Sequence, residues 1–374
     1  WFLYTRLVHA LEITSPTILW PLRLLAVFLA ASYILVRLWE RVAPEPAAYA
    51  GEWVAANWIG MMFELLWLTA AFWIIHLLLR VFGIWSRLDP GQQTLIGRWS
   101  VIVVISAALI ICGYAMWRAA QPARIARASV PVKNVTPEIR QLSIALVADF
   151  HAGVLVGSRQ VRRMARQVVS CKPDVILVPG DILDHPPDRI RKTALAFQEL
   201  RAPLGVYGST GNHEYYINVN AAVSLIHECG IQMLNNEAVE LPQGLVIAGI
   251  TDRTALQFHL PRPKVDEFVA AHSNGKPTIL LNHTPVTDEA QAASRAGADL
   301  VVSSHTHGGQ IWPFSLLTKL TFTFHHGLYK LDRGHIITTC GIGTWGPAMR
   351  LGAPPEIVLI KLVGENEPAT FEWE

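Results

Sequence analysis

Charged residues are scarce in this chain of 374 residues. Asp, Glu, Lys and Arg make up 16% of it, whereas soluble domains carry about 25%, and the mean hydropathy is +0.31. The formal net charge is only +2. Because nucleic-acid binding depends on a strongly basic surface, this near-neutral total argues against a nucleic-acid partner.

Cysteine is also rare, and an initiator methionine is lacking. The four cysteines are scattered, and no two have the spacing of a zinc knuckle or a redox pair. The first apolar stretch, Trp1 to Leu11, is too short to cross a bilayer. We interpret it as the end of an earlier helix, which would make a fourth span. A signal peptide is a poorer interpretation, because no small-residue cleavage site follows.

Three long apolar runs precede residue 120, namely Trp20 to Trp39, Val54 to Trp85 and Ser100 to Trp117. Each approaches or exceeds the roughly 20 residues with which a helix crosses a bilayer. Tryptophans lie at their ends, as interfacial anchors do. We therefore predict a transmembrane helical region at residues 1–120, with about three full spans and the lipid bilayer as a partner.

Basic residues hardly distinguish the two sides of this membrane region. One set of helix ends carries five arginines, and the other set carries six basic residues: Arg37, Arg41, Arg118, Arg124, Arg127 and Lys133. The positive-inside rule therefore favours a cytoplasmic position for the following domain by a single charge. The basic stretch 118–133 is consistent with contact to anionic headgroups or with an ordinary solvated stop after a helix.

After a linker at residues 121–137, short β runs alternate with amphipathic helical segments through residues 138–374. Typical runs are Leu142 to Ala148, Asp174 to Val178, Thr278 to Leu281 and Leu300 to Ser303. This alternation predicts a layered α/β domain. Loops at one edge of the sheet in such domains are where functional residues gather.

Residues able to bind metal ions follow these runs in five short motifs. In chain order, the candidate residues are Asp149, His151, Asp181, Asp184, Asn212, His213, Glu214, His283, His305 and His307. Each motif alone is weak evidence, since a single Asp-x-His occurs by chance and Gly-Asn-His-Glu is typical of a turn before a capped helix. All five in order favour a pair of divalent ions with nitrogen and oxygen ligands, a centre suited to displacement at phosphorus.

The residue types indicate different tasks within such a centre. Asp181 has two carboxylate oxygens and can bridge two cations. Asp184 is better placed to hold a neighbouring ligand or loop. His213 can be cationic near neutral pH and reach a substrate oxygen, and Glu214 could orient it. The roles of His185, His325 and His326 stay open.

The five motifs resemble those of the calcineurin-like metallophosphoesterases throughout residues 141–363. The block from Ser304 to Gln310 is similar to the last signature of that family, except that Ser304 stands where Gly is usual. The stretch from Gly341 to Arg350 resembles the ending of the membrane-anchored bacterial branch. Several members of that branch are similar to UDP-2,3-diacylglucosamine pyrophosphohydrolases, or to phosphodiesterases of undefined substrate. The resemblance thus implies an integral protein of a bacterial inner membrane.

This resemblance implies N-terminal transmembrane helices followed by an α/β domain of four layers, in which two packed β-sheets are flanked by helices. It implies two divalent metal ions; manganese, iron and zinc all accept such ligands, and the sequence does not distinguish among them. The first ion would be held by Asp149, His151, Asp181 and His307. The second would be held by Asp181, Asn212, His283 and His305. A hydroxide bridging the ions would attack phosphorus in line, and His213 would protonate the leaving group.

A nearly uncharged segment, Ile311 to Phe324, begins directly beside the proposed ligands. It is consistent with a buried helix and strand that close the domain. The alternative is an apolar lip, including Trp312 and Phe314, that enters the bilayer or receives acyl chains. Arg350 could contact a phosphate or sugar oxygen of the substrate, and a surface role is equally consistent with its position.

The sequence is therefore consistent with three functions. The first is hydrolysis of a phosphodiester or pyrophosphate in a phosphorylated lipid or nucleotide-sugar lipid. The second is a phosphoesterase for soluble phosphodiesters or phosphoproteins, with the helices as a simple tether. The third is a transporter or sensor bundle with a regulatory metal domain, for which Glu64 and His76 are the ionisable candidates within the apolar runs.

Overall fold

The computed structural model describes residues 1–39, 42–43 and 45–374, which divide into two compact units. One unit comprises Trp1–Arg118 with Gly346–Met349, and the other comprises Ala119–Trp345 with Arg350–Glu374. Arg41, which contributes to the charge comparison above, lies outside the described residues.

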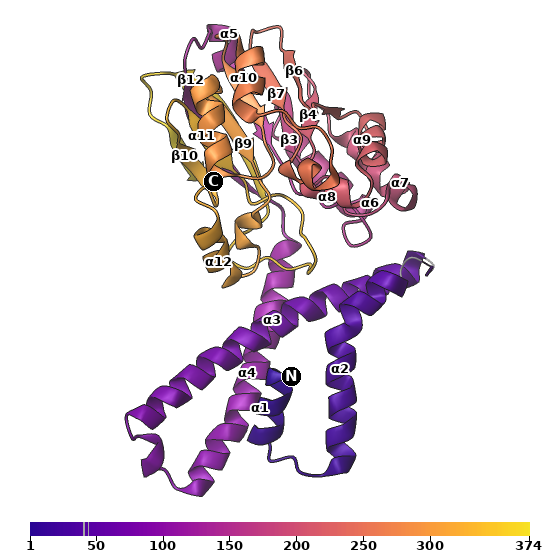
Figure 1. Cartoon of the computed structure of the whole chain (residues 1–374), viewed down its shortest axis with the longest axis vertical. Helices are drawn as coiled ribbons and strands as arrows, with labels where there is room; N and C mark the ends of the chain where they lie inside the picture. Colours follow the sequence, from indigo (N-terminus) through magenta and orange to yellow (C-terminus); the bar gives the residue numbers. More distant parts are fainter. Residues whose placement is uncertain (40–41, 44) are drawn as a thin grey trace. The chain divides into compact units, whose positions relative to one another are not determined.

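The first unit consists of helices, which are labelled α1 to α4 in Figure 1. Its helices are α1 (Phe2–Ala10), α2 (Pro16–Trp39), α3 (Glu45–Val81) and α4 (Pro90–Ala119), with a short 3-10 helix η1 (Trp85–Arg87). Pro16–Trp39, Ala47–Val81 and Pro90–Ala119 are long and apolar enough to cross a membrane. Large apolar side chains such as Leu24 and Ile110 point away from these helices and are exposed. Such a surface is stable in a bilayer, so the three expected spans are confirmed as apolar helices.

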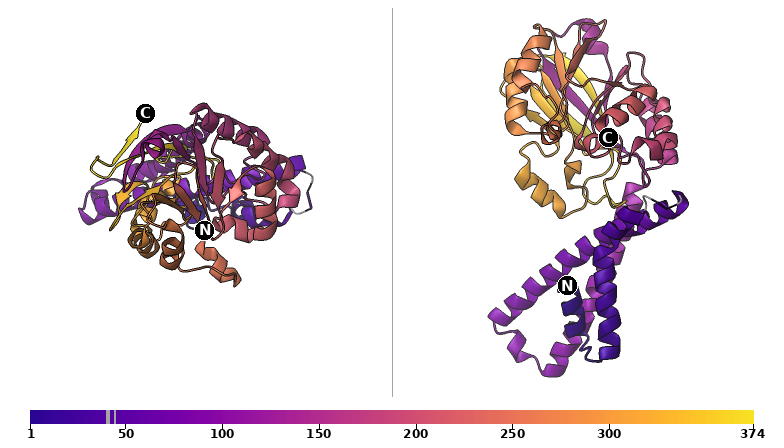
Figure 2. Two further views of the ribbon diagram at one scale, coloured as in Figure 1. Left: turned by 90° about the horizontal axis from the view of Figure 1, so that it is seen from above. Right: turned by 45° about the vertical axis from the view of Figure 1, so that its right-hand side comes forward.

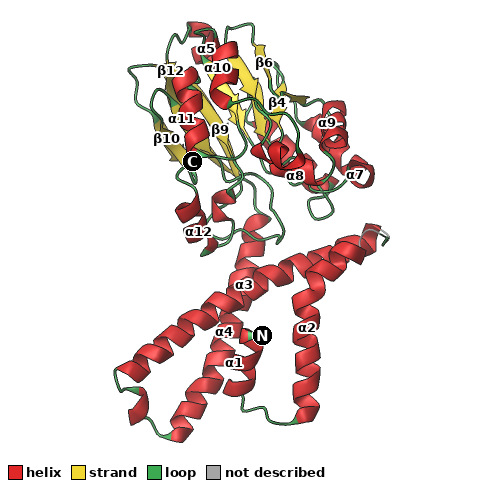
Figure 3. Cartoon of the chain, viewed as in Figure 1, coloured by secondary structure: helices red, strands yellow, loops and turns green. Residues whose placement is uncertain are grey.

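The second unit contains two β-sheets with the orders β13-β1-β12-β2-β3-β4-β5 and β10-β11-β9-β8-β7-β6 (Figure 3). The strands are β1 (Arg124–Val132), β2 (Ile144–Leu146), β3 (Val175–Pro179), β4 (Val206–Ser209), β5 (Gln232–Met233), β6 (Glu237–Glu240), β7 (Val246–Gly249), β8 (Thr278–Leu281), β9 (Leu300–Ser303), β10 (Gly327–Lys330), β11 (His335–Thr338), β12 (Glu356–Gly364) and β13 (Thr370–Trp373).

Helices connect the strands and cover the two outer faces of this pair of sheets. The helices are α5 (Pro137–Gln141), α6 (Ser158–Ser170), α7 (Pro187–Ala194), α8 (Asn212–Tyr216), α9 (Val219–Glu228), α10 (Val265–Ser273), α11 (Thr287–Ala296) and α12 (Phe314–Thr321), with 3-10 helices η2 (Leu195–Glu199), η3 (Arg253–Phe258) and η4 (His307–Gly309). In the right-hand view of Figure 2, α10 and α11 in orange lie on one side of the sheets, and α6 to α9 lie on the other.

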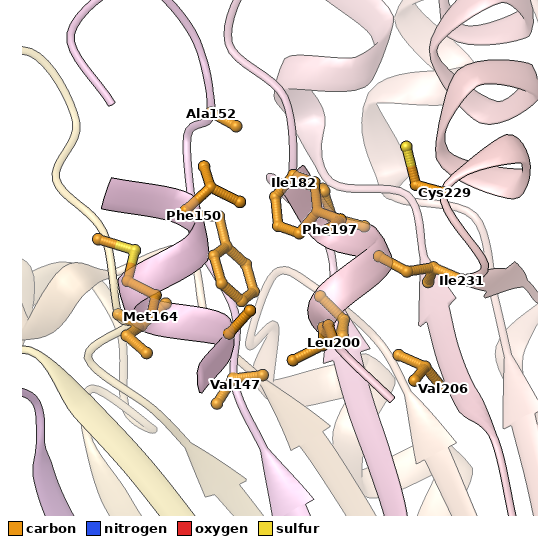
Figure 4. Packing of buried hydrophobic residues seen from close by; sticks show 14 of the residues in the cluster. Val147, Phe150, Ala152, Met164, Ile182, Phe197, Leu200, Val206, Cys229 and Ile231 are labelled. Carbon is orange, nitrogen blue, oxygen red and sulfur yellow. The ribbon is translucent and has the colours of Figure 1, made fainter. Parts of the chain in front are cut away.

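Three apolar clusters separate these layers. One lies between the sheets and includes Leu177 and Ile247. A second joins the seven-stranded sheet to α6, α7 and α9, and a third joins the six-stranded sheet to α10 and α11. In Figure 4 the rings of Phe150 and Phe197 lie at the centre of the second cluster, edge to face with centroids 5.0 Å apart. The four-layer α/β fold is therefore confirmed.

The predicted linker at 121–137 differs from the structure. Arg124–Val132 forms β1, which pairs in parallel with β12 and antiparallel with β13. Ala126, Ala128 and Val130 are buried, while Arg127 between them is exposed. This alternation is the two-residue period of a strand with one buried face. Alanine, arginine and proline in the stretch hid the pattern, because these residues are uncommon in strands or typical of loops.

Strand direction sets the place of the site. β2, β3 and β4 run parallel in the seven-stranded sheet, and β7, β8 and β9 run parallel in the six-stranded sheet. Parallel strands bring their carboxyl ends to one edge of their sheet, where the following loops meet. Each of these strands is short and almost wholly buried, so its loop starts from a fixed position.

Candidate metal centre

The seven candidate ligands lie in the segments that directly follow five of these parallel strands, either in loops or at the start of the next helix. Asp149 and His151 come after β2, Asp181 after β3, Asn212 after β4, His283 after β8, and His305 and His307 after β9. All seven side chains are buried or nearly so. Their donor atoms form two adjoining groups, described in turn.

The first group contains Asp149, His151 and His307. One ligand atom from each lies within 4.8 Å of the other two. His151 Nε2 is 3.0 Å from His307 Nε2, and His307 Nε2 is 3.8 Å from Asp149 Oδ2. Two imidazole nitrogens at this separation face a common point, as two ligands of one cation do.

The second group contains Asp181, Asn212, His283 and His305. Asn212 Oδ1 lies 3.1 Å from His283 Nε2 and 2.8 Å from His305 Nδ1. Asp181 Oδ2 lies 3.3 Å from His283 Nε2. The group therefore offers two imidazole nitrogens, one amide oxygen and one carboxylate oxygen to a single position.

Asp181 joins the two groups. Its Oδ2 is 3.8 Å from His151 Nε2 in the first group and 3.3 Å from His283 Nε2 in the second. His283 and His213 lower the pKa of Asp181 well below its ordinary value, although burial acts in the opposite direction. A carboxylate that stays ionised between two sets of ligands has the position required of a bridging ligand.

The backbone of the site is strained. Five of the seven candidate ligands have a positive φ, namely Asp149, His151, Asp181, His305 and His307, with values between 47° and 68°. This left-handed region is uncommon for residues other than glycine, and such conformations persist only where the surroundings enforce them. Their concentration here indicates that the loops are shaped to aim side chains inward.

Glycines allow these loops to approach one another. A Cβ added at Gly211 would lie 2.2 Å from Asp181 Oδ1, and one added at Gly341 would lie 2.6 Å from Asp149 Cβ. Both positions therefore require glycine, because any side chain would displace a candidate ligand.

Two buried polar atoms of the first group make no hydrogen bond within the described part of the chain. Asp149 Oδ2 and His151 Nδ1 have no hydrogen-bond partner among the described residues. Burial lowers the pKa of His305 to about 4 and, with the nearby charges of His151 and Arg350, lowers that of His307 well below its usual value. Neutral imidazoles and carboxylate oxygens without hydrogen bonds are the forms that bind cations, so His305, His307 and Asp149 fit divalent metal ions. Against the effect of burial, the carboxylates of Asp181 and Asp149 raise the pKa of His283 to about 10, so His283 must release a proton to bind a metal ion.

Outer hydrogen bonds orient His283. Its Nδ1 lies 2.8 Å from the carbonyl oxygen of Pro179, which leaves Nε2 directed at Asn212 and Asp181. Ser304 Oγ donates to the same carbonyl at 3.1 Å. The serine that replaces the usual glycine is thus buried and bonded, and it supports the ligand loop rather than disturbing it.

His213 is held by Asp184. Its Nδ1 is 2.5 Å from Asp184 Oδ1, while its Nε2 is 4.0 Å from Asp181 Oδ2. Asp181 and Asp184 raise the pKa of His213 to about 9, against the effect of burial. Without bound metal ions the imidazole is therefore cationic at neutral pH, and its Nε2 faces the donor atoms.

Glu214 differs from the prediction that it orients His213. Its carboxylate instead accepts hydrogen bonds from four backbone amides, those of Asp181, Ile182, Leu183 and Gly211. It therefore binds the loop after β3 to the start of α8. The prediction failed because residues i and i+1 of a helix do not face each other.

Arg350 differs from both of its predicted roles. It is fully buried, and its guanidinium donates to the carbonyl oxygens of His307, Cys340, Gly341, Gly343 and Ala353. No part of it is available to a substrate or to solvent. A planar group with five N–H donors suits this task of fixing converging loops.

The segment after η4 forms an exposed apolar surface rather than a buried closure. Trp312 and Phe314 are each 42% exposed, and Leu316, Leu317 and Leu320 of α12 are 54%, 53% and 85% exposed. Phe322, just past α12, lies edge to face with His305 at 5.7 Å. This surface is called the apolar lip below, and it adjoins the second ligand group.

Two features escaped the sequence. Asp252, three residues after β7, accepts hydrogen bonds from Thr284 Oγ1 at 2.6 Å and from the Thr254 amide at 2.8 Å. Its place past a parallel strand, like that of the ligands, could have marked it. The Gln310 side chain donates a hydrogen bond to the Trp345 carbonyl oxygen and accepts one from the Trp345 amide. The Trp345 ring lies edge-on to His213, with ring centroids 6.3 Å apart. No local pattern connects those two residues.

Comparison with known proteins agrees with this geometry. The family model described as calcineurin-like phosphoesterase matches residues 142–309. An uncharacterized metallophosphoesterase of Aquifex aeolicus is 32% identical over 235 residues, which cover 62% of this chain and 88% of that protein. The chain belongs to the calcineurin-like metallophosphoesterase family.

Two further relatives are also similar to this chain in sequence. An uncharacterized metallophosphoesterase of Helicobacter pylori is 34% identical over 229 residues, 61% of each chain. A protein of Danio rerio named "Transmembrane protein with metallophosphoesterase domain" is 31% identical over 275 residues, 71% of this chain and 63% of that protein. The chain thus spans about three-fifths of the length of these two relatives.

Proposed function

We propose that this metallophosphoesterase is a membrane-anchored hydrolase that uses two divalent metal ions to cleave a phosphodiester or pyrophosphate of a lipid-linked substrate. The supporting observation is the convergence of two ligand groups on one carboxylate. Asp149, His151 and His307 form one group, and Asp181 connects them to the other.

Each ion would have its own ligands. Asp149, His151 and His307 would hold the first, Asn212, His283 and His305 the second, and Asp181 both. This mixture of imidazole, carboxylate and amide donors suits manganese, iron or zinc. When bound, two such ions supply an activated water as nucleophile and neutralise charge on the phosphoryl oxygens.

His213 would act on the leaving group. It holds a proton at Nε2, and Asp184 fixes its Nδ1 so that this proton faces the donor atoms. The raised pKa keeps the proton in place at neutral pH until the leaving oxygen accepts it. Glu214 contributes by holding the backbone around Asp181, and so fixes the distance over which the proton moves.

Metal removal tests the reaction. The full chain, purified in detergent and treated with a chelator, is expected to lose hydrolysis of bis(4-nitrophenyl) phosphate. Re-addition of Mn²⁺ or Zn²⁺ is expected to restore it, with about two ions per chain bound at this centre. Undiminished hydrolysis by the metal-free protein would contradict the proposal.

The apolar lip supports a lipid-borne substrate. Exposed apolar surface of this extent beside catalytic donors is typical of contacts with acyl chains or with a bilayer. The three helices that are long and apolar enough to cross a membrane support an association of the chain with a bilayer. An acyl chain on the lip would bring its phosphate beside His305, whose ring contacts Phe322.

Paired substrates test this part separately. Trp312→Ser with Phe314→Ser is expected to lower kcat/KM for a micellar lipid phosphodiester about tenfold, since two apolar contacts are lost. Turnover of bis(4-nitrophenyl) phosphate should stay unchanged. Leu195→Ser, which alters an exposed apolar residue of η2, is the matched control. Equal losses on both substrates would instead favour a soluble phosphodiester, with the helices as a tether.

The proposal also concerns the membrane in which the chain lies and the side on which its phosphoesterase domain is found. The Danio rerio relative is named as a transmembrane protein, which supports membrane anchoring of this chain. We place the chain in a bacterial inner membrane with its phosphoesterase domain in the cytoplasm. Protease should then cleave the domain in inverted membrane vesicles and spare it in intact spheroplasts. The reverse result would put the domain on the other side.

A further inference from the structure

A second cluster of donor atoms lies outside the candidate metal centre. It consists of His326 just before β10, Cys340 just after β11, and Glu356 at the start of β12. One ligand atom from each lies within 4.8 Å of the other two. Because β10 and β11 belong to the six-stranded sheet and β12 to the seven-stranded sheet, this thiol cluster connects the two sheets.

Distances within the thiol cluster match those between ligands of one ion. His326 Nε2 lies 3.2 Å from Glu356 Oε2 and 3.3 Å from Oε1. Zinc binds imidazole nitrogen and carboxylate oxygen at about 2.0–2.1 Å in a tetrahedron, which places two such ligands about 3.3 Å apart. An ion between His326 and Glu356 therefore needs little movement of either side chain.

The donor types also indicate a particular class of ion. Imidazole nitrogen, thiolate sulfur and carboxylate oxygen together suit zinc and similar borderline ions. Cys340 is a free, buried thiol, and Glu356 is fully buried. The His326 side chain is 23% exposed, which would allow an ion to enter from the solvent.

Surrounding residues hold the three side chains in place. Glu356 Oε2 accepts hydrogen bonds from Thr339 Oγ1 at 2.9 Å and from the Cys340 amide at 2.8 Å. The ring of His326 lies against Phe371 at 5.8 Å and Trp373 at 5.7 Å. Such outer contacts are what fixes metal ligands in proteins.

We propose that His326, Cys340 and Glu356 bind one further divalent cation of the zinc class. Binding releases the thiol proton of Cys340 and the Nε2 proton of His326 to the solvent, so that the thiolate and the neutral imidazole can both ligate. This ion would be separate from the two of the candidate metal centre. Cys340 Sγ lies close to Gly308 in the segment that carries His307, because a Cβ added at Gly308 would be only 2.7 Å from this sulfur. An ion bound to Cys340 would therefore also restrain that segment.

Cobalt substitution distinguishes this site from the candidate metal centre. A thiolate ligand gives Co²⁺ an intense near-ultraviolet charge-transfer absorption, and the seven ligands of the other centre include no sulfur. The full chain, loaded with Co²⁺ in detergent, is expected to show this band. Cys340→Ser should remove the band and about one bound equivalent of cobalt. Cys171→Ser, another free thiol of the same unit, should retain both.

The outcomes are decisive without any assay of hydrolysis. Absence of the band in the unaltered chain, or its persistence in Cys340→Ser, would overturn the proposal and leave a buried His326–Glu356 ion pair. His326→Ala changes the partly exposed member and guards against misfolding in the thiol variant. It should weaken cobalt binding, followed through the band, by at least about tenfold.

Discussion

The candidate metal centre and the thiol cluster combine similar side chains in different structural settings. Five of seven residues in the centre have a positive φ, whereas none of the three in the thiol cluster does. Asp149 Oδ2 of the centre makes no hydrogen bond with the described residues, while both oxygens of Glu356 are hydrogen-bonded. Strain and unmet hydrogen-bonding capacity are therefore concentrated where the reaction is proposed. The thiol cluster has the features of a site that stabilises structure.

The substitution with the largest expected effect on activity tests whether the candidate metal centre and the thiol cluster are independent. Asp181→Asn should lower kcat/KM by roughly 10³ or more, because the shared anionic ligand of both ions is lost. Bound metal at the centre should fall with it, measured by elemental analysis. Asp266→Asn, on the exposed face of α10, is the control with the same chemistry. If Asp181→Asn also removed the thiolate–cobalt band, the two clusters would act as one.

His213→Gln should have the second largest effect on activity. Loss of a positioned proton donor lowers kcat by about 10² to 10⁴ for an alkyl leaving group. For 4-nitrophenolate, which leaves without a proton, the loss should be much smaller. Metal content should stay unchanged, since His213 belongs to neither ligand group. A uniform loss on both leaving groups would exclude His213 as the acid.

Asp184→Asn should have a smaller effect, about 10- to 100-fold, because it acts through His213. The charge of Asp184 raises the pKa of His213 to about 9 together with that of Asp181. Its removal should lower that pKa, so the protonated fraction falls at alkaline pH. The alkaline limb of the profile of kcat/KM against pH should then move to lower pH. An unmoved limb would contradict the role of Asp184.

Arg350→Met should change the chemistry least and stability most. Five carbonyl groups would lose a buried charged donor, which costs roughly 3 kcal/mol or more. The thermal unfolding midpoint should drop clearly below that of Arg333→Met, an exposed control. KM should remain the same. A selective rise in KM without loss of stability would restore the role in substrate binding.

The sequence predicted the candidate ligand set because the signal for these residues is local. Each of the seven residues stands within a few positions of a buried apolar strand, and such strands can be recognised by composition alone. Parallel strands then bring their loops together without further information. The same reasoning could have included Asp252, which follows β7 in the same way.

Other features were hidden because they depend on contacts between distant segments. Asp184 orients His213 and Glu214 binds the loop after β3, whereas the sequence suggested the opposite assignment. The actual assignment depends on how the loop after β3 meets α8. Arg350 is buried only because several loops converge on it. β1 was taken for a linker, since its small buried alanines gain significance only beside β12.

By itself, the sequence determined the apolar helices, the layered domain, and the type and order of the candidate ligands. These follow from hydrophobic periodicity and from residues adjacent in the chain. The tertiary structure alone decided that Asp181 lies between two ligand groups, and that His326, Cys340 and Glu356 meet across two sheets. The physical reason is that donor atoms bind one ion only at separations of a few ångströms, and only packing between distant segments sets those separations.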